Sequence, residues 1–115
     1  MNYSEKALSY MQSIRVGDHP IETFIKVINP LPIAIHKGIT VQFTLQNGPV
    51  KEEGVNGCQV LDMMYFTRNM IIALNGDFPC EENKATIEYL NQAIIKQVER
   101  TANRVARGVE GTSQN

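Results

Sequence analysis

The sequence predicts an α+β fold, with a small antiparallel β element at the N-terminal side followed by a long antiparallel two-helix hairpin. The second half carries two helical periodicities of apolar residues joined by a short connection, and the first half carries two short stretches with strand character. A chain of 115 residues with 43% hydrophobic content is enough for one small domain. We therefore expect a single domain over residues 1–115, with the β element in residues 1–54 and the hairpin in residues 55–110.

The N-terminal part is predicted to hold three short elements. A helix over residues 5–13 follows the N-cap candidate Ser4. Strands are predicted over residues 22–28, which are rich in Ile, Val, Phe and Thr, and over residues 39–45, where apolar and polar residues alternate. Residues 51–54 are charged and end in glycine, so we expect a flexible linker into the helices.

The first long helix is predicted to open at Asn56 or Gly57 and to stop at Asn75-Gly76, a common C-terminal signal. Tyr65 and Phe66 lie in its middle and are expected to pack in the core or at an interface. The positions expected to form its apolar stripe are Val60, Leu61, Met64, Met70, Ile71 and Leu74.

The second helix is predicted from about Glu81 to about Gly108. Acidic residues at its start and arginines at its end match the helix dipole, and the glycine ends it. The short connection before it implies that the two helices are antiparallel. Its expected buried positions are Ile87, Leu90, Ile94, Val98, Thr101 and Val105, and the polar residues 111–115 are expected to fray.

Composition and single-residue chemistry exclude several classes of function. A net charge of -1 disfavours a general nucleic-acid binder, and the absence of a long apolar run predicts a cytoplasmic protein without a membrane anchor. Cys58 and Cys80 lack metal-site spacing, which predicts no metal. His19 and His36 show no recognisable catalytic arrangement, so we expect no enzyme and no cofactor.

A row of cations is the most informative feature of the second helix. Arg100, Arg104 and Arg107 recur at helical spacing on one face, Lys96 extends that face, and Glu99 is the one acid among them. One interpretation is a solvated surface that complements the helix dipole. The other is a set of guanidinium groups that bind phosphate in pairs of hydrogen bonds.

A nucleotide site also needs groups that hold a base and a ribose, and Phe78 and Asn83 near the hairpin turn are the candidates. Asn83 and Arg100 are 17 residues apart, about 26 Å along one helix, so a small nucleotide cannot touch both within one chain. If they share a site, two antiparallel hairpins must form it together. We therefore expect a homo-oligomer.

Several segments of the hairpin resemble a known family. They are residues 56–60 (NGCQV), 78–83 (FPCEEN), 85–87 (ATI), 99–104 (ERTANR) and 107–112 (RGVEGT). Together they resemble the hairpin family shared by the phage Thoeris anti-defence one and anti-CBASS two proteins, over about half of the chain. The strands ahead of the hairpin are more similar to the Thoeris anti-defence one branch, since the anti-CBASS branch is wholly helical.

The resemblance implies a sponge rather than an enzyme. Family members bind cyclic ADP-ribose isomers made by TIR proteins without degrading them, some also bind the cyclic oligonucleotides of CBASS systems at separate sites, and dimers and hexamers occur. By resemblance, Asn83, Arg100 and Arg104 supply the amide and arginines of the pocket, with Arg107 beside them. The aromatic position is less well matched, because either Phe78 supplies the ring or the family ring position falls at Ala73-Leu74.

Two interpretations follow from the sequence. The first is a cytoplasmic sponge for TIR-generated cyclic ADP-ribose in the infected bacterial host. Nanomolar capture corresponds to about -12 kcal/mol and requires a closed, preorganised pocket, so strand or loop residues should form its lid. The alternative is an oligomeric helical-hairpin protein that binds a host protein or nucleic acid through the basic helix face.

Overall fold

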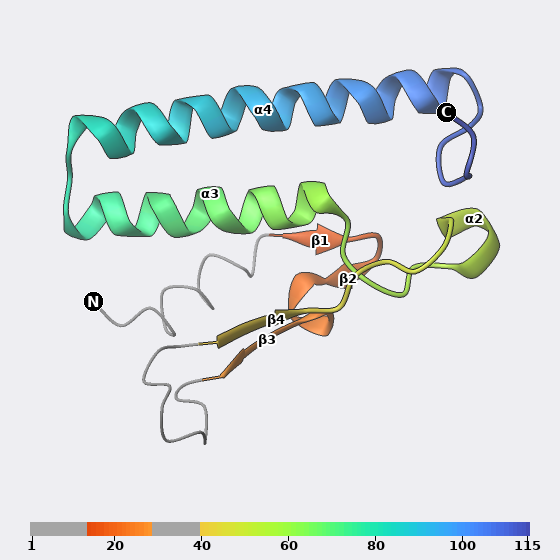
Figure 1. Ribbon diagram of the computed structural model, residues 1–115, viewed down its shortest axis with the longest axis horizontal. Coiled ribbons are helices and arrows are strands. Elements are labelled where there is room, and N and C mark those ends of the chain that lie inside the picture. Colours follow the sequence, from red (N-terminus) through yellow and green to blue (C-terminus); the bar gives the residue numbers. More distant parts are fainter. Residues whose placement is uncertain (1–13, 29–39) are drawn as a thin grey trace.

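The computed structural model describes residues 14–28 and 40–115, and its two long helices lie antiparallel above a set of short N-terminal strands (Figure 1). The α+β prediction is confirmed. The predicted helix over residues 5–13 lies outside the described residues. The elements in chain order are β1 (Arg15–Val16), β2 (His19–Pro20), η1 (Ile21–Thr23), β3 (Ile25–Ile28), β4 (Thr40–Phe43), α2 (Val50–Glu53), α3 (Val60–Asp77) and α4 (Glu81–Ala106).

The strands form two small antiparallel sheets, β1 with β2 and β3 with β4, the latter with Ile25 opposite Phe43. The strand predicted over residues 22–28 begins later, at Ile25, because residues 21–23 form a 3₁₀ turn. Ile21 in that turn has 0% exposure, so burial of this side chain holds the turn in place.

The strand predicted over residues 39–45 is shorter than expected but continues as backbone pairing. After β4, Leu45 forms a parallel bridge with Cys58, just ahead of α3. Phe43 is half-buried and meets Phe66 edge to face at 5.5 Å between ring centroids. Leu45, two residues further along the same alternation, is instead 58% exposed, because the chain leaves its pairing with β3 there and pairs with Cys58.

Gly57 makes this pairing possible. A Cβ at this position would lie 2.3 Å from the Leu45 carbonyl carbon and 2.5 Å from the Gln46 nitrogen. The Cys58 N–H donates to the Thr44 carbonyl at 2.7 Å and the Gln46 N–H donates to the Cys58 carbonyl at 2.9 Å. The absence of a side chain therefore lets two backbones approach and fixes the start of α3 against the end of β4.

The segment between β4 and α3 is more ordered than the predicted linker. Residues Val50–Glu53 form the short helix α2, so the linker prediction is wrong. The amide nitrogen of Gln46 donates to the Gly54 carbonyl at 2.9 Å, and the Asn56 N–H donates to the Gln46 amide oxygen at 2.9 Å. Asn56 and Asn47 exchange a further pair of hydrogen bonds. These local bonds give the loop a defined shape.

Helix α3 begins at Val60 rather than at Asn56 or Gly57, since residues 57–58 are held in extended pairing with the end of β4. It continues through Asn75-Gly76 to Asp77. Phe66 and Ala73 are buried, whereas Val60, predicted in the apolar stripe, is 69% exposed at the first turn. The buried face also carries polar residues, Asp62 and Asn69, which apolar periodicity cannot identify.

Helix α4 agrees closely with its prediction. It runs over Glu81–Ala106, and Gly108, with φ of +73°, follows its C-cap. Ile94 is buried against α3. Val98, Thr101 and Val105 were predicted to be buried but are exposed, Val98 to 46% and Val105 to 61%. Since α4 has 26 residues and α3 has 18, the last turns of α4 extend beyond its partner. The main buried cluster comprises Ile14, Val16, Ile21, Ile25, Cys58 and Phe66.

Candidate functional site

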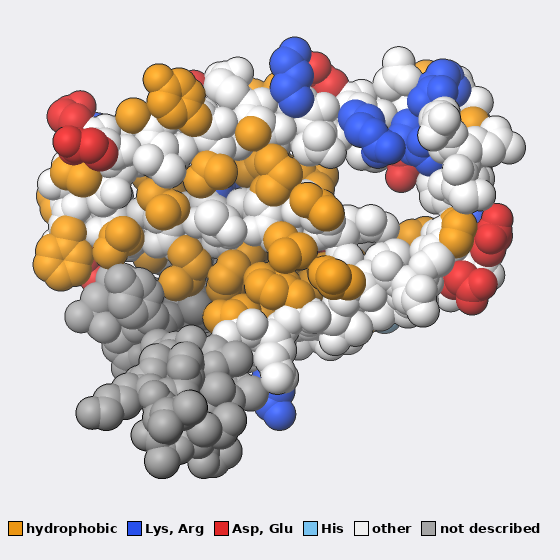
Figure 2. Space-filling view, viewed as in Figure 1, with side chains coloured by type: hydrophobic (Ala, Val, Ile, Leu, Met, Phe, Trp, Pro, Cys, Tyr) orange, Lys and Arg blue, Asp and Glu red, His pale blue; other side chains and the backbone are white. Residues whose placement is uncertain are grey.

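A cleft lies beneath the overhanging end of α4, where three parts of the chain meet. It comprises two cavities of about 620 and 300 Å³ that share part of their lining. Volumes in this range hold small organic ligands. The residues common to both cavities are Gln46, Val50, Gln59, Arg100 and Glu110. Figure 2 shows the molecule hollowed at this place, with Lys and Arg side chains gathered on the α4 side.

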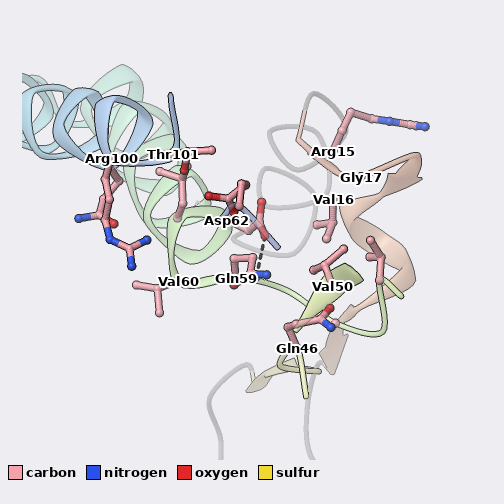
Figure 3. Close-up of a pocket in the computed structure, with 15 residues that line it drawn as sticks. Arg15, Val16, Gly17, Gln46, Val50, Gln59, Val60, Asp62, Arg100 and Thr101 are labelled. Atoms are coloured by element: carbon pink, nitrogen blue, oxygen red, sulfur yellow. Dashed lines mark hydrogen bonds between the residues drawn. The ribbon is translucent and has the colours of Figure 1, made fainter. Parts of the chain in front are cut away.

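The larger cavity has walls of different chemistry (Figure 3). Arg100 and Thr101 of α4 lie on one side, and Val16 and Val50 lie on the other, with Asp62 between them. Apolar walls with a few polar groups are typical of sites for small molecules that carry an apolar ring and a charged part. Gln46 and Val50, from the loop ahead of α2 and from its first residue, form part of the wall.

Arg100 is the exposed cation that lines both cavities of the cleft. It lines both cavities from the last third of α4, and within the described part of the chain no acceptor bonds to its guanidinium group. Lys96, one turn earlier, is instead paired with Glu99 at 3.2 Å and lines neither cavity. The helix spacing of the basic row is confirmed, but its members have different surroundings.

Arg104 is buried, at 6% exposure, and the C-terminal residues surround it. Its guanidinium donates to the Glu110 carboxylate at 3.1 Å and to the carbonyls of Gln114, Val109 and Thr112 at 2.6, 2.9 and 3.1 Å. The prediction that residues 111–115 fray is therefore wrong, because the Arg104 guanidinium donates hydrogen bonds to carbonyl groups of this segment.

The C-terminal residues also cross the cleft. The Lys51 N–H of α2 donates to the Gly111 carbonyl at 2.9 Å. Arg107 donates to the Asn103 side chain at 2.8 Å and to the Asn115 carbonyl at 2.6 Å. The tail thus joins the end of α4 to α2 and closes one side of the cleft. Arg107 forms a hydrogen bond with this tail.

Asn83 and Phe78 lie at the other end of α4 (Figure 1). The Asn83 amide donates to the Phe78 carbonyl at 3.2 Å, and the Cys80 sulfur accepts the Asn83 N–H at 3.4 Å. The Phe78 ring is 61% exposed. As expected from a continuous helix, Asn83 lies about 26 Å from Arg100 in the same chain, and Phe78 precedes the helix. The structure therefore brings Arg100 and Arg104 together but leaves Asn83 and Phe78 apart from them.

Asp62 and Cys58 are the titratable groups with perturbed environments. Burial raises the pKa of the Asp62 carboxyl above its usual value, partly opposed by the Gln59 N–H that donates to it at 2.7 Å. Burial, together with the nearby Asp62 charge, raises the pKa of the Cys58 thiol to about 11. Cys58 is therefore a protonated core thiol at neutral pH, whereas Cys80 is exposed.

The sequence reasoning missed the cleft residues Gln46, Gln59, Asp62 and Thr101. They come from segments far apart in the chain, so no spacing could reveal that they meet. Gln59 and Asp62 alone have a local sequence signal. They are the N-cap and the third residue of α3, and an acidic residue at the third position commonly accepts the N-cap N–H.

Among the described residues, no group of three or more His, Cys, Asp or Glu gathers as a metal site would require. The described helices include none with the length and apolar character needed to cross a bilayer.

The fold and cleft define a class: a small α+β protein in which a helical hairpin and a polar loop enclose a ligand-sized cavity. No family model matches the chain. The chain is 43% identical over 77 residues to Thoeris anti-defense 1 of Bacillus phage SBSphiJ7, a match that covers 65% of this chain and 52% of that protein. The chain thus spans about half the length of the curated relative it matches. This similarity confirms the resemblance to the Thoeris anti-defence family.

Proposed function

We propose that the protein is a phage anti-Thoeris sponge, which binds TIR-generated cyclic ADP-ribose isomers without degrading them. The observation that carries the proposal is the cleft lined by the unpaired Arg100, in a chain similar to Thoeris anti-defense 1. Sequestration starves the receptor of its activator and requires no turnover. Cyclic oligonucleotides of CBASS systems are a second ligand class for the same test.

Arg100 is the phosphate-binding group in this proposal. A free guanidinium at the edge of a cavity offers two parallel N–H donors to phosphate oxygens. Arg104 lies beside it in the smaller cavity, with four of its hydrogen bonds directed to Glu110 and the tail. A clamp by both arginines, and any contact from Arg107, therefore requires the tail to exchange some of these bonds for ligand oxygens.

Asn83 and Phe78 of a neighbouring chain would complete the pocket. The helix length keeps them out of reach of Arg100 in their own chain. The exposed Phe78 ring is available for stacking, whereas Ala73, at the alternative position for an aromatic ring, is 2% exposed inside the hairpin. Aromatic stacking on a base is worth about 1 to 3 kcal/mol in nucleic-acid sites.

Exposed apolar residues along the hairpin support the homo-oligomer that this pocket needs. Ile95, Val98 and Ala102 line a shallow groove with Tyr65 and Arg68 of α3. Figure 2 shows hydrophobic side chains gathered over α3 and α4 on this face of the molecule. A small chain with such an open stripe gains stability by burying it against another hairpin.

The test is capture and release. Purified protein is mixed with a TIR-made cyclic ADP-ribose isomer, filtered to remove unbound ligand, heated, and the released ligand is identified by mass spectrometry. The proposal expects stoichiometric release of the unchanged molecule. No capture, or release of a cleaved product, contradicts it. Retention only of a host protein or nucleic acid would favour the alternative hairpin interaction protein.

Arg100→Ala is the matched site variant and Lys96→Ala its control, because both remove one cation from the same face of α4. Loss of a bidentate charge-assisted contact should weaken binding about 100-fold, corresponding to about 3 kcal/mol. Lys96 lies outside both cavities and is already paired, so its variant should remain within about threefold of wild type. Equal losses in both variants would place the phosphate elsewhere.

A further inference from the structure

Asp62 is a carboxylate at the inner wall of the cleft that the arginine contacts do not use. It is 9% exposed and lines the larger cavity from the first turn of α3. One of its oxygens accepts the Gln59 N–H at 2.7 Å. No described residue donates to the other oxygen, and no buried polar side-chain atom in the described part lacks a partner. The second oxygen therefore reaches the open space of the cavity.

Helix stability does not fully account for this group. An acid in the first turn interacts favourably with the helix dipole and accepts the N-cap N–H, which explains one of the two oxygens. Desolvation is nevertheless the largest influence on the Asp62 carboxyl and raises its pKa, so the ionised form is less stable here than in water. A residue that weakens the fold in its charged form is more often kept for a function.

The surroundings of Asp62 suggest what its free oxygen binds. Of the charged groups that line the same cavity, Arg15, Arg100 and Glu110, none is ion-paired with it. Figure 3 places Asp62 between Thr101 and the apolar residue Val16, within the cavity that Arg100 borders. A cation for phosphate and a carboxylate acceptor deeper in the same cavity match a ribonucleotide, whose phosphates are acceptors and whose ribose hydroxyls are donors.

We propose that Asp62 is a specificity-determining residue that accepts a hydrogen bond from a ribose hydroxyl of the nucleotide held by Arg100. The inference rests on the proposed function and names the ligand feature that it selects. Acidic residues perform this role for the ribose diol in dinucleotide-binding folds. A carboxylate cannot donate, so a deoxyribose leaves it buried without a partner, and a phosphorylated ribose is repelled.

The experiment is a double-mutant cycle between the protein and the ligand. Wild type and Asp62→Asn are titrated by calorimetry with a TIR-made cyclic ADP-ribose isomer and with two analogues that each lack one hydroxyl, one on either ribose. The amide has the shape of the carboxyl group and retains an acceptor for the Gln59 N–H. For wild type, one analogue should bind about ten- to a hundredfold more weakly than the parent. For Asp62→Asn that penalty should shrink to about threefold or less.

Glu110→Gln is the control, because it removes the other carboxylate of the same cleft. It should keep the full penalty for the deoxy analogue. The inference is overturned if the deoxy analogue loses as much affinity with Asp62→Asn as with wild type. It is also overturned if that loss disappears only in Glu110→Gln. Either result leaves the sponge proposal intact. Failure of wild type to bind the parent ligand overturns both. Unfolding of each variant by circular dichroism confirms that the compared proteins are folded.

Discussion

Gly57→Ala should strongly destabilise the protein, because the added methyl group meets backbone rather than movable side chains. The new Cβ would lie 2.3 Å from the Leu45 carbonyl carbon. An ordinary contact begins at 3.4 Å, so the two segments must separate by about 1.1 Å (3.4 minus 2.3). The flanking hydrogen bond from Cys58 to Thr44, now 2.7 Å, would lengthen to about 3.8 Å and be lost.

The expected cost combines two contributions. Overpacking costs about 1 to 3 kcal/mol, and the two backbone hydrogen bonds beside Gly57 contribute about 1 kcal/mol each. We therefore expect a loss of about 3 to 5 kcal/mol, a large fraction of the stability of a domain this size. With about 4 °C per kcal/mol, the melting temperature should fall by about 12 to 20 °C.

The assay is thermal and urea unfolding at one fixed protein concentration, since oligomer dissociation makes the midpoint concentration-dependent. Gly76→Ala is the control. Gly76 lies in α3 without a positive φ, and a methyl group added there would meet no neighbouring segment within 4 Å, so alanine should add up to about 1 kcal/mol. A Gly57→Ala protein as stable as wild type would refute the close-approach argument, and so would a Gly76→Ala protein that loses stability.

Three further results are expected. The pKa of Asp62 is raised in the folded state, so the protonated carboxyl stabilises the fold fully below about pH 4, and this stabilisation is lost as the pH rises through the raised pKa. In urea unfolding, Asp62→Asn should therefore gain stability relative to wild type between about pH 4 and pH 7. A thiol reagent should modify Cys80 quickly and Cys58 only on unfolding, and equal rates would contradict the burial of Cys58. Arg104→Lys cannot hold three carbonyls in a planar fork, so amide exchange at Lys51, which donates to the tail, should accelerate at least tenfold; unchanged protection there would mean that the tail docks without the guanidinium.

The hairpin was predictable because its signals are local. Glu81 and Gly108 mark the ends of α4 through charge and backbone freedom, and the short connection dictates an antiparallel partner. The exposure of Val98 and Val105 was not predictable, since it depends on where α3 begins. That boundary is set by Gly57 pairing with the end of β4, a contact between segments that are separate in the sequence.

The candidate site was predictable only in its basic row. Arg100 and Arg104 were found from helical spacing, but the spacing gave no indication that one is free and the other is enclosed by the tail. The walls from the loop 46–50 and from Asp62 come from tertiary packing. The placement of Asn83 and Phe78 with Arg100 in one pocket remains a prediction, because it depends on a second chain.

The unequal length of the two long helices has a consequence for how the site can evolve. Helix α4 has 26 residues and α3 has 18, so α4 extends 8 residues, or about 12 Å, past the N-terminal end of α3. Apart from Arg104, which holds the tail, the side chains on this overhanging segment contribute little to the packing between the helices, so exchanges at its exposed positions cost the fold little stability. Exposed positions on this segment, Arg100 among them, can therefore change while the hairpin core stays the same.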